Sequence, residues 1–227
     1  MSACVVIPTY EEAENLPALV AATRAALECT IGVVDDGSPD GTGDVADALA
    51  GSGLWVLHRP RKAGLASAYV AGFRRALAGG ADYVLQMDAD FSHDPADLPR
   101  LLSAARAGAD LVIGSRYVDG GGVEGWSRHR ELLSRAGCAY ARAVLGGPVR
   151  DLTGGFKCFR AAALRAIDLD AIAAGGFAFQ VETTHRALRG GLRVEEVPIT
   201  FHERRAGHSK LSAGIAAEAL WRIPALR

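Results

Sequence analysis

The sequence has few cysteines, and their spacing gives them no joint role. Its 227 residues include four, Cys4, Cys29, Cys138 and Cys158. No two of them form a C-x-x-C pair or a spacing typical of a metal site. We therefore interpret them as reduced thiols in a cytoplasmic protein, which excludes a disulfide framework.

Long apolar runs and a leader segment are also missing. A membrane-spanning helix needs about 18 consecutive apolar residues, and no uninterrupted apolar stretch in this sequence comes near that length. The N-terminus, "MSACVVIPTYEE", has no basic region before its apolar residues and reaches Glu11 quickly. It does not resemble a signal peptide. We predict that no segment spans a membrane.

The sequence also lacks an excess of positive charge. Lys and Arg total 25 against 26 Asp and Glu, for a formal net charge of −1. This balance does not favour nucleic acid as a partner. Hydrophobic residues make up 49% of the chain, enough for a globular core. The length predicts one domain, residues 1–227.

What the sequence does contain is an alternation of two patterns. Short apolar runs occur at residues 3–8, 31–36, 54–57, 82–88 and 110–115. Helical patterns follow at 14–28, 42–50, 64–78 and 95–107, and further on at 128–145 and 177–190, with a last strand near 192–200. This alternation predicts an open α/β fold, with a mostly parallel sheet and helices on both faces.

In such folds, ligands bind beyond the carboxyl ends of the strands. Four of these ends read "PTYEE", "DDGSPDGT", "DADFSH" and "SRYVDGGG". Three of them are acidic, and the fourth begins with Arg116. The site is therefore expected at this edge of the sheet, and it combines carboxylates with at least one guanidinium.

Asp88 and Asp90 are the most informative acidic pair. Residues two apart in an extended stretch point to the same side, so both carboxylates can face one cation. Their hard oxygens suit Mg²⁺ or Mn²⁺ and leave coordination positions for phosphate oxygens and water. The alternative is an acidic turn that caps the helix starting near Pro95. The pair alone does not decide between them.

The stretch "VVDDGSPDGT" raises a similar choice. An aspartate at a strand end can accept hydrogen bonds from a ribose hydroxyl or a base, but it can also brace the turn, and for one of the two we expect bracing. Residues 41–46, "GTGDVA", fit the dinucleotide pattern G-x-G-x-x-A. The aspartates around this pattern would repel a bare pyrophosphate, so an NAD-binding or non-catalytic nucleotide-binding module is kept as the alternative from another class.

Positive side chains gather in the second half of the chain. Arg128, Arg130 and Arg135 lie near Trp126, and Arg204 and Lys210 lie in the loop "HERRAGHSK". Guanidinium groups suit phosphate oxygens, and a lysine adds a compact charge. For Arg128 and Arg205 we expect a solvated surface. Acidic strand ends and a separate basic loop fit a metal-bound diphosphate between them.

Taken together, these stretches resemble the family 2 glycosyltransferases of the GT-A fold, and within them the polyprenyl (dolichyl) phosphate mannosyltransferases. The resemblance covers about residues 3 to 212. It is carried by "VVIPTYEEAENLP", "VVDDGSPDGT", "RKAGLASAYVAGF", "QMDADFSHDP", "GSRYVDGGGVEGWSRHR", "DLTGGFKCFR" and "RRAGHSK" in that order. It implies transfer of mannose from GDP-mannose to a polyprenyl phosphate with inversion; a glucosyl- or other sugar-transferase of the same family is the alternative.

The resemblance also implies site residues. The donor would be bound by Pro8, Tyr10, Glu12, Val34, Asp36, Asp88, Ala89, Asp90, Arg116, Arg204 and Lys210. Asp88 and Asp90 would hold Mg²⁺ or Mn²⁺. Arg116 and Arg130 would bind the acceptor phosphate, and catalysis would rest on Asp90, Arg204 and Lys210. The nucleotide-binding half would be about 1–115 and the acceptor-side half about 116–227. Two departures from the family are Glu11 in place of Asn and Ser92 in place of a Gln.

A lipid acceptor requires contact with a membrane. Many bacterial relatives carry C-terminal transmembrane helices, whereas this sequence stops at "LWRIPALR". We therefore expect peripheral attachment at the cytoplasmic face, through a membrane-embedded partner subunit or a surface helix. Residues 125–147 offer such a helix. Its apolar residues, at helical spacing, are Leu132, Leu133, Ala136, Tyr140, Ala143 and Val144, and its basic ones Arg128, Arg130, Arg135 and Arg142. The alternative is a helix whose apolar side packs on the sheet.

Overall fold

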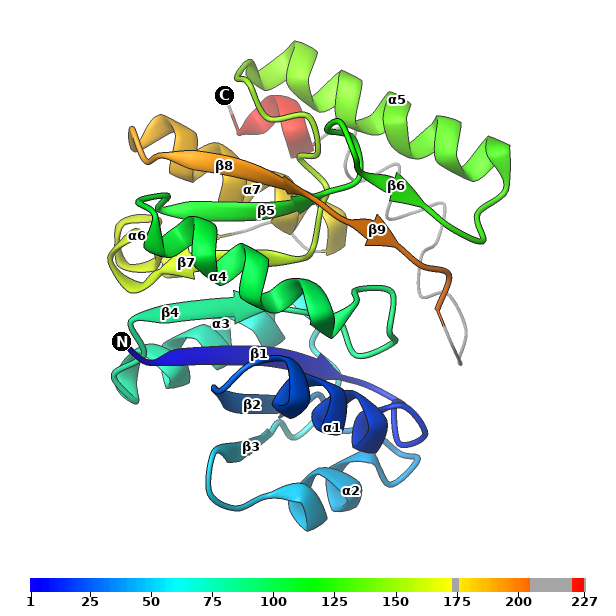
Figure 1. Ribbon diagram of the computed structural model, residues 1–227, viewed down its shortest axis with the longest axis vertical. Helices are drawn as coiled ribbons and strands as arrows, with labels where there is room; N and C mark the ends of the chain where they lie inside the picture. The colour runs from blue at the N-terminus through cyan, green and yellow to red at the C-terminus, as the bar shows by residue number, and fades with distance from the viewer. Residues whose placement is uncertain (173–175, 205–221, 227) are drawn as a thin grey trace.

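A computed structural model of the chain describes residues 1–172, 176–204 and 222–226. Its centre is a seven-stranded sheet in the order β3-β2-β1-β4-β7-β5-β8 (Figure 1). The strands are β1 (Ala3–Thr9), β2 (Thr30–Asp35), β3 (Leu54–His58), β4 (Tyr83–Gln86), β5 (Leu111–Ser115), β7 (Lys157–Arg160) and β8 (Val194–Pro198). One sheet therefore runs through both halves of the chain.

Strand direction confirms a mostly parallel sheet with one exception. β1 is parallel to β2 and β4, β2 to β3, and β5 to β8. β7 is antiparallel to both of its neighbours, β4 and β5. The sequence did not predict this strand, because "KCFR" is short and has charged residues at both ends. It joins the nucleotide-side strands to β5 and β8.

The helices cover both faces of the sheet, as predicted. One face carries α1 (Leu16–Ala26), α2 (Thr42–Leu49) and α4 (Leu98–Arg106), the last preceded by a short 3₁₀ turn, η1 (Pro95–Asp97). The other carries α3 (Leu65–Ala78), α5 (Arg128–Leu145), α6 (Ala161–Ala166), a 3₁₀ turn η2 (Leu169–Ala171) and α7 (Gly176–Arg189). In Figure 1, α1 and α4 lie in front of the sheet, and α3 and α7 lie behind it.

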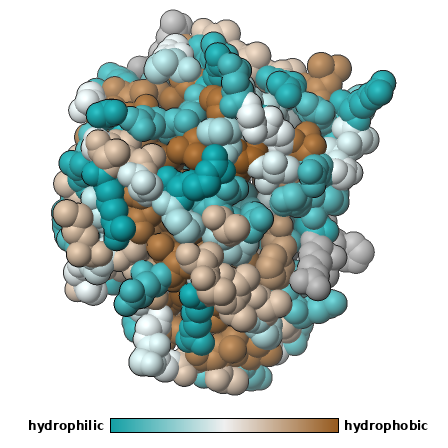
Figure 2. Space-filling model, in the orientation of Figure 1, coloured by the Kyte–Doolittle hydropathy of each residue, from teal (hydrophilic) through white to brown (hydrophobic). Residues whose placement is uncertain are grey.

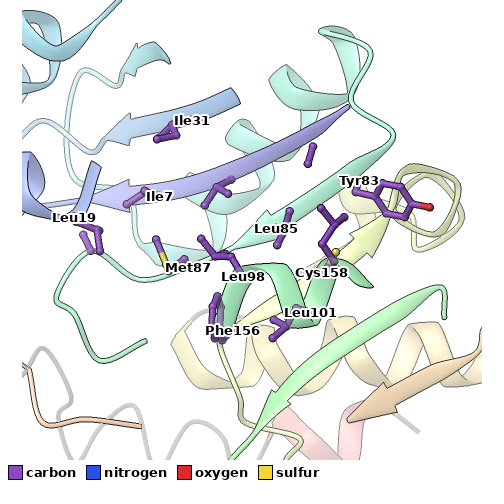
Figure 3. Close-up of a cluster of buried hydrophobic side chains, with 14 of the residues drawn as sticks. Ile7, Leu19, Ile31, Tyr83, Leu85, Met87, Leu98, Leu101, Phe156 and Cys158 are labelled. Atoms are coloured by element: carbon purple, nitrogen blue, oxygen red, sulfur yellow. The ribbon is translucent and has the colours of Figure 1, made fainter. Parts of the chain in front are cut away.

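Two buried clusters form the core, one on each face. Successive residues of β1 alternate between them: Val5 and Ile7 point to the first cluster, and Cys4 and Val6 to the second. Figure 3 shows part of the first cluster, where side chains of the strands meet those of α1 and α4. Because both faces are buried, the strands read as continuous apolar runs in the sequence.

α3 packs unusually close to the sheet. A Cβ added to Gly72 would lie 2.4 Å from the Val6 Cγ1 atom and 3.0 Å from the Val34 Cγ2 atom. Only glycine allows this approach. The close packing brings the preceding turn of α3, including Tyr69, to the sheet face near the carboxyl end of β4.

A second, two-stranded parallel sheet lies beside the main one. It consists of β6 (Gly122–Val123) and β9 (Thr200–Phe201), which lie together near the carboxyl ends of the central strands (Figure 1). None of the helices in the described ranges has both the length and the hydropathy needed to cross a bilayer.

Candidate active site

The carboxyl ends of β2, β1 and β4 lie side by side, because these strands are neighbours in that order. The turn after β4 is the centre of the site. Its backbone is fixed at several points: Phe91 has a φ of 60°, the Ser92 N–H donates to Asp90 Oδ1 (3.0 Å), and the Asp88 N–H donates to His93 Nδ1 (3.2 Å). A non-glycine residue with positive φ is uncommon and indicates a turn held in shape by its surroundings.

His93 anchors this turn to the rest of the protein. Its ring is 1% exposed, stacks on Phe156 at 4.8 Å between ring centroids, and meets the edge of Phe201 at 5.3 Å. Burial lowers the pKa of His93, so the imidazole is neutral and its Nδ1 can accept the Asp88 N–H. β9 is tied to the same turn, since the His202 N–H donates to the Ser92 carbonyl (3.0 Å).

Asp88 and Asp90 each have a fixed partner. Tyr69 donates its hydroxyl hydrogen to Asp88 Oδ1 at 2.7 Å, and Arg204 Nη2 lies 3.2 Å from Asp90 Oδ2. Burial raises the pKa of the Asp88 carboxyl, and the negative charge of Asp90 raises it further. A nearby cation would relieve this like-charge repulsion.

The residues of the turn fit a hard divalent cation. They offer carboxylate oxygens, and Ser92 adds a hydroxyl that is 1% exposed and makes no hydrogen bond to any described residue. Oxygen donors of this kind suit Mg²⁺ and Mn²⁺. Among the described residues no group of three His, Cys, Asp or Glu side chains forms a candidate metal site. Substrate oxygens and water would have to complete the coordination.

At the end of β2, both aspartates brace loops. Asp35 accepts hydrogen bonds from the Ser38 hydroxyl (2.5 Å) and the Ser38 N–H (3.2 Å). Asp36 pairs with Arg59 (2.8 Å) and accepts the N–H groups of Ala63 and Gly64 (both 2.9 Å). Bracing, expected for one aspartate, is confirmed and extends to both. Contact between Asp36 and a donor stays a prediction.

The dinucleotide pattern does not form a phosphate site. Asp40 accepts the Thr42 N–H (3.1 Å) and the Thr42 hydroxyl (2.6 Å) at the start of α2. A carboxylate therefore occupies the position at the helix N-terminus where a pyrophosphate would bind. The second strand, not the first, precedes this helix. The electrostatic argument against a dinucleotide site is supported.

The end of β1 carries one departure from the family pattern, Glu11 in place of Asn. Glu11 has a φ of 57°, a left-handed conformation that Asn tolerates better than Glu. Tyr10 lies under Lys62, whose Nζ is 3.8 Å from the ring centroid. Glu12 is 8% exposed and accepts a hydrogen bond from Asn15 Nδ2 (2.9 Å).

Three predicted donor residues are buried in the strands or the turn. Pro8 lies within β1, opposite Val34 of β2. Val34 is fully buried, and its side chain belongs to the second core cluster, so a donor would not reach that side chain. Ala89, between the two aspartates, is 4% exposed. Their role in donor binding stays a prediction.

Arg116, predicted to bind phosphate, has an internal partner. Its Nε and Nη2 atoms donate to the two oxygens of Asp151, each at 2.7 Å, and the pair is 6% and 0% exposed. Burial alone would raise the pKa of Asp151, but the Arg116 guanidinium keeps it below its ordinary value. Removing one member of such a buried pair typically costs about 3–5 kcal/mol. Arg116 thus has a structural role whether or not it contacts phosphate.

The predicted basic residues differ in position. Arg130 pairs with Glu203 (2.6 Å) and lies 4.2 Å from the Trp126 ring, with 37% of its side chain exposed. Arg204 reaches the acidic pair directly. Lys210 lies outside the described residues, so its placement beside the diphosphate stays a prediction.

Sequence reasoning missed three residues of the site. Tyr69 and His93 hold Asp88, and Asp151 holds Arg116. Tyr69 and His93 were part of the motif stretches "RKAGLASAYVAGF" and "QMDADFSHDP", but a tyrosine on a helix reads as core. Its polar contact depends on how α3 packs, which one sequence does not reveal.

Comparison with known proteins decides the family. The model of the family described as glycosyl transferase family 2 matches residues 4–168. The chain belongs to this family. The resemblance drawn from its motifs is confirmed, and this glycosyltransferase is an enzyme of the same class as its relatives.

Two relatives of this glycosyltransferase are similar over almost the whole chain. The undecaprenyl-phosphate mannosyltransferase of Micrococcus luteus is 52% identical, covering 97% of this chain and 91% of the relative. The polyprenol monophosphomannose synthase of Mycolicibacterium smegmatis is 48% identical, covering 96% and 84%.

Solved structures support the fold. Glucosyl-3-phosphoglycerate synthase from Mycobacterium tuberculosis, in complex with Mn²⁺, UDP-glucose and phosphoglyceric acid, superposes with a TM-score of 0.74. The match covers 99% of this chain and 79% of that one, at 20% identity. At this identity the likeness shows the fold alone, and it confirms the GT-A-like α/β architecture.

Proposed function

We propose that this glycosyltransferase transfers mannose from GDP-mannose to a polyprenyl phosphate. The observation that carries the proposal is the identity of 52% and 48%, over nearly the full chain, to enzymes named for mannosyl transfer to a polyprenyl phosphate. The choice of GDP-mannose as donor rests on the resemblance of the motifs. The chemistry of the site agrees with it: a carboxylate pair suited to a cation lies beside a guanidinium, at the strand ends where a nucleotide would bind.

In this proposal the two halves of the chain divide the substrates. Residues 1–115 would bind the nucleotide sugar, chiefly at the ends of β1, β2 and β4, and residues 116–227 would bind the acceptor. Asp88 and Asp90 would hold Mg²⁺ or Mn²⁺, which neutralises a diphosphate leaving group when bound. Arg204 and Lys210 would add positive charge as GDP leaves.

The acceptor requires little proton transfer. A phosphate monoester is already largely anionic near neutral pH, so attack on the sugar needs no strong general base. Attack from the face opposite the diphosphate would invert the anomeric centre and give a β-mannosyl phosphate. Arg130 is better suited than Arg116 to meet the incoming phosphate, since 37% of its side chain is exposed against 6%.

A donor panel tests the function. Purified protein is mixed with a short polyprenyl phosphate, Mg²⁺ or Mn²⁺, and labelled GDP-mannose, GDP-glucose, UDP-glucose or UDP-N-acetylglucosamine. We expect label in the lipid product with GDP-mannose and its loss with chelator. Preference for another nucleotide sugar would favour the alternative of a glucosyl- or other sugar-transferase. Absence of transfer from every donor would contradict the proposal.

The acidic pair has its own test. Asp88→Asn and Asp90→Asn each remove a negative oxygen and nearly keep the shape of the side chain. We expect both variants to fold and to lose at least 100-fold in turnover, on the order of the loss for a removed electrostatic stabiliser. Metal-dependent GDP binding should weaken with it. Near-normal activity in both would return the pair to the interpretation as an acidic turn.

The lipid substrate also requires a membrane contact, which we assign to α5. Of its 18 residues only Cys138 and Ala141 are buried, and Tyr140 and Val144 pack partly on the second core cluster. Leu132 and Leu133, which begin the apolar series, are instead 67% and 62% exposed. Packing on the core therefore does not account for these two leucines.

The exposed side of α5 suits an anionic lipid surface. Arg128, Arg135 and Arg142 are spaced seven residues apart and so follow one flank of the helix, beside the exposed Leu132. Glu131 neutralises part of this charge through its pair with Arg135 (2.9 Å). Along the upper edge of the molecule, where α5 runs in Figure 1, Figure 2 shows hydrophobic and hydrophilic residues side by side. Arginines near an anionic surface contribute about 1 kcal/mol each.

A further inference from the structure

Beneath the acidic pair lies a tyrosine that no motif assigns to the reaction. We propose that Tyr69 is a positioning residue, which fixes the Asp88 carboxylate in the orientation that receives the divalent cation. This inference rests on the proposed function, because it assumes that Asp88 is a metal ligand. It adds a residue from α3 to a site otherwise built from the strand ends.

The contact is short and specific. The Tyr69 hydroxyl donates to Asp88 Oδ1 at 2.7 Å, which is typical of a hydrogen bond to a charged acceptor. The hydrogen bond joins α3 to the turn after β4, through two residues that lie 19 positions apart in the sequence. The carboxylate therefore has one oxygen committed to the phenol.

The phenol itself has no freedom to move. Tyr69 is 0% exposed, and its ring stacks on Phe73 (5.6 Å between centroids) and on Phe179 (5.9 Å, with planes 4° apart). The helix that carries it is held against β1 by the close approach at Gly72. A donor on so rigid a support sets the direction of the group it binds.

Asp88 is consequently held from two sides. Tyr69 fixes Oδ1 of its side chain, and His93 fixes its backbone N–H. The second oxygen, Oδ2, lies on the side of Gly155, 3.5 Å from where a Cβ on that glycine would be. This leaves one defined oxygen for a cation. Partners that orient a ligand in this way typically change metal affinity or activity by about 10- to 100-fold when removed.

A simpler interpretation is that Tyr69 is a core residue whose hydroxyl takes the nearest acceptor. A buried tyrosine hydroxyl needs a partner in either case. The two interpretations differ in what the hydroxyl does for Asp88. Tyr69→Phe removes the hydroxyl and keeps the ring, so it separates positioning from packing.

The experiment is a titration of the purified protein with Mn²⁺ alone, followed by electron paramagnetic resonance. We expect Tyr69→Phe to raise the Mn²⁺ Kd by about 10- to 100-fold. The Mn²⁺ concentration for half-maximal transfer should rise by a similar factor, while kcat at saturating Mn²⁺ changes less. Circular dichroism and thermal unfolding without metal check that the variant is folded.

Tyr83→Phe is the matched control. Tyr83 is also buried and lies at the start of β4, the strand that leads to Asp88, but its hydroxyl contacts Met1 Sδ at 3.6 Å, far from the carboxyl end of β4. We expect its Mn²⁺ Kd to match that of the wild type. A Kd within twofold of the wild type for folded Tyr69→Phe would overturn the inference.

A double-mutant cycle with Asp88→Asn separates this inference from the proposed function. If Tyr69 acts through Asp88, removing its hydroxyl has no further effect on Mn²⁺ binding in the Asp88→Asn background. Weak binding by Asp88→Asn together with wild-type binding by Tyr69→Phe would refute only the role of Tyr69. Wild-type Mn²⁺ binding by Asp88→Asn would instead refute the metal pair of the proposed function.

Discussion

Arg204 pairs with Oδ2 of Asp90, one of the carboxylate oxygens that the proposed cation would use. Its Nη2 atom lies 3.2 Å from Asp90 Oδ2, with 22% of the Arg204 side chain exposed. A metal that takes this oxygen must displace the guanidinium, which would then be available to the diphosphate. One arginine would thus oppose the metal before the donor arrives and assist the reaction afterwards.

This competition gives a prediction of two opposite effects. Without nucleotide, Arg204→Ala should tighten Mn²⁺ binding by about fivefold, corresponding to roughly 1 kcal/mol for a partly exposed pair. Turnover with GDP-mannose should nevertheless fall, because charge stabilisation of the leaving group is lost. Mn²⁺ titration and initial rates measure the two effects.

Arg193→Ala is the control for the same assays. Arg193 precedes β8 at the opposite end of the sheet and pairs with Glu195. Neither metal binding nor turnover should change in this variant. Unchanged or weaker Mn²⁺ binding by Arg204→Ala would show that the guanidinium does not compete with the cation.

At the residue scale, the sequence predicted positions better than partners. The acidic pair and Arg204 were expected on either side of a diphosphate, and the structure places Arg204 directly against Asp90. The ion pair between Arg116 and Asp151 joins residues 35 positions apart, and Asp36 forms an ion pair with Arg59. Such pairs depend on how loops from different strands meet, which local patterns do not encode.

At the scale of elements, α5 shows how one amphipathic pattern can serve two surfaces. Tyr140 and Val144 pack toward the core, whereas Leu132 and Leu133 face solvent. Periodicity predicted a helix over 128–145, and the structure has it at Arg128–Leu145. Periodicity could not predict which apolar residues of α5 are covered by the core, because that depends on where the sheet ends.

The exposed leucines provide the test of membrane contact. With Leu132 and Leu133 both changed to Ser, the partition coefficient onto vesicles containing phosphatidylglycerol should fall by up to about 1000-fold, because about 2 kcal/mol of apolar insertion is lost per leucine. Binding by the wild type should rise with anionic lipid and fall with salt.

Leu65→Ser is the matched control for this test, since Leu65 is 39% exposed on α3 rather than α5. It should float like the wild type. Equal flotation of the α5 variant and the wild type, or no binding by the wild type at any lipid composition, would assign membrane recruitment to a separate partner subunit.

For the whole molecule, a buried lysine makes stability depend on pH. Lys157 is 0% exposed, and its Nζ donates to the Gln180 carbonyl (2.8 Å) and to the hydroxyls of Thr183 and Thr184 (both 3.0 Å). Burial lowers its pKa from 10.5 to about 7, and Asp151 opposes part of that shift. The hydrogen bonds of Lys157 link β7 to α7, but burying its amine costs desolvation free energy.

The sign of the effect follows from proton binding. Between pH 7 and 10.5 the unfolded chain holds a proton on this lysine that the folded protein has released. The free energy of unfolding therefore rises with pH in this window, by at most about 1.4 kcal/mol per pH unit from this group. Below about pH 7 both states are protonated and the dependence disappears.

Urea unfolding of the wild type and of Lys157→Met at pH 6, 7.5 and 9 measures this effect. The difference in unfolding free energy between the two proteins cancels the titration of all other groups. It should shift in favour of the wild type as pH rises above 7. A difference that is constant across the three pH values would show that the lysine titrates normally.

The fold class was predictable because it depends on alternation along the chain. Five apolar runs and the helical patterns between them predicted a mostly parallel α/β sheet, and the structure and its solved neighbour agree. β7 was not predicted because its sequence, with Lys157 and Arg160 at its ends, does not resemble a buried strand. An antiparallel insertion of this kind is decided by tertiary packing.

The position of β7 also has a consequence for synthesis. β4 pairs with β1 on one side, but its other side, like one side of β5, is covered by β7 alone. β5 ends at Ser115 and β7 begins at Lys157, so all of α5 leaves the ribosome before the gap can be filled. Until then the nascent chain carries an open strand edge, the kind of surface that recruits chaperones or other strands. β7, four residues long with a charged residue at each end, is then inserted between β4 and β5, which precede it in the chain, and β8 is added to the other side of β5 afterwards.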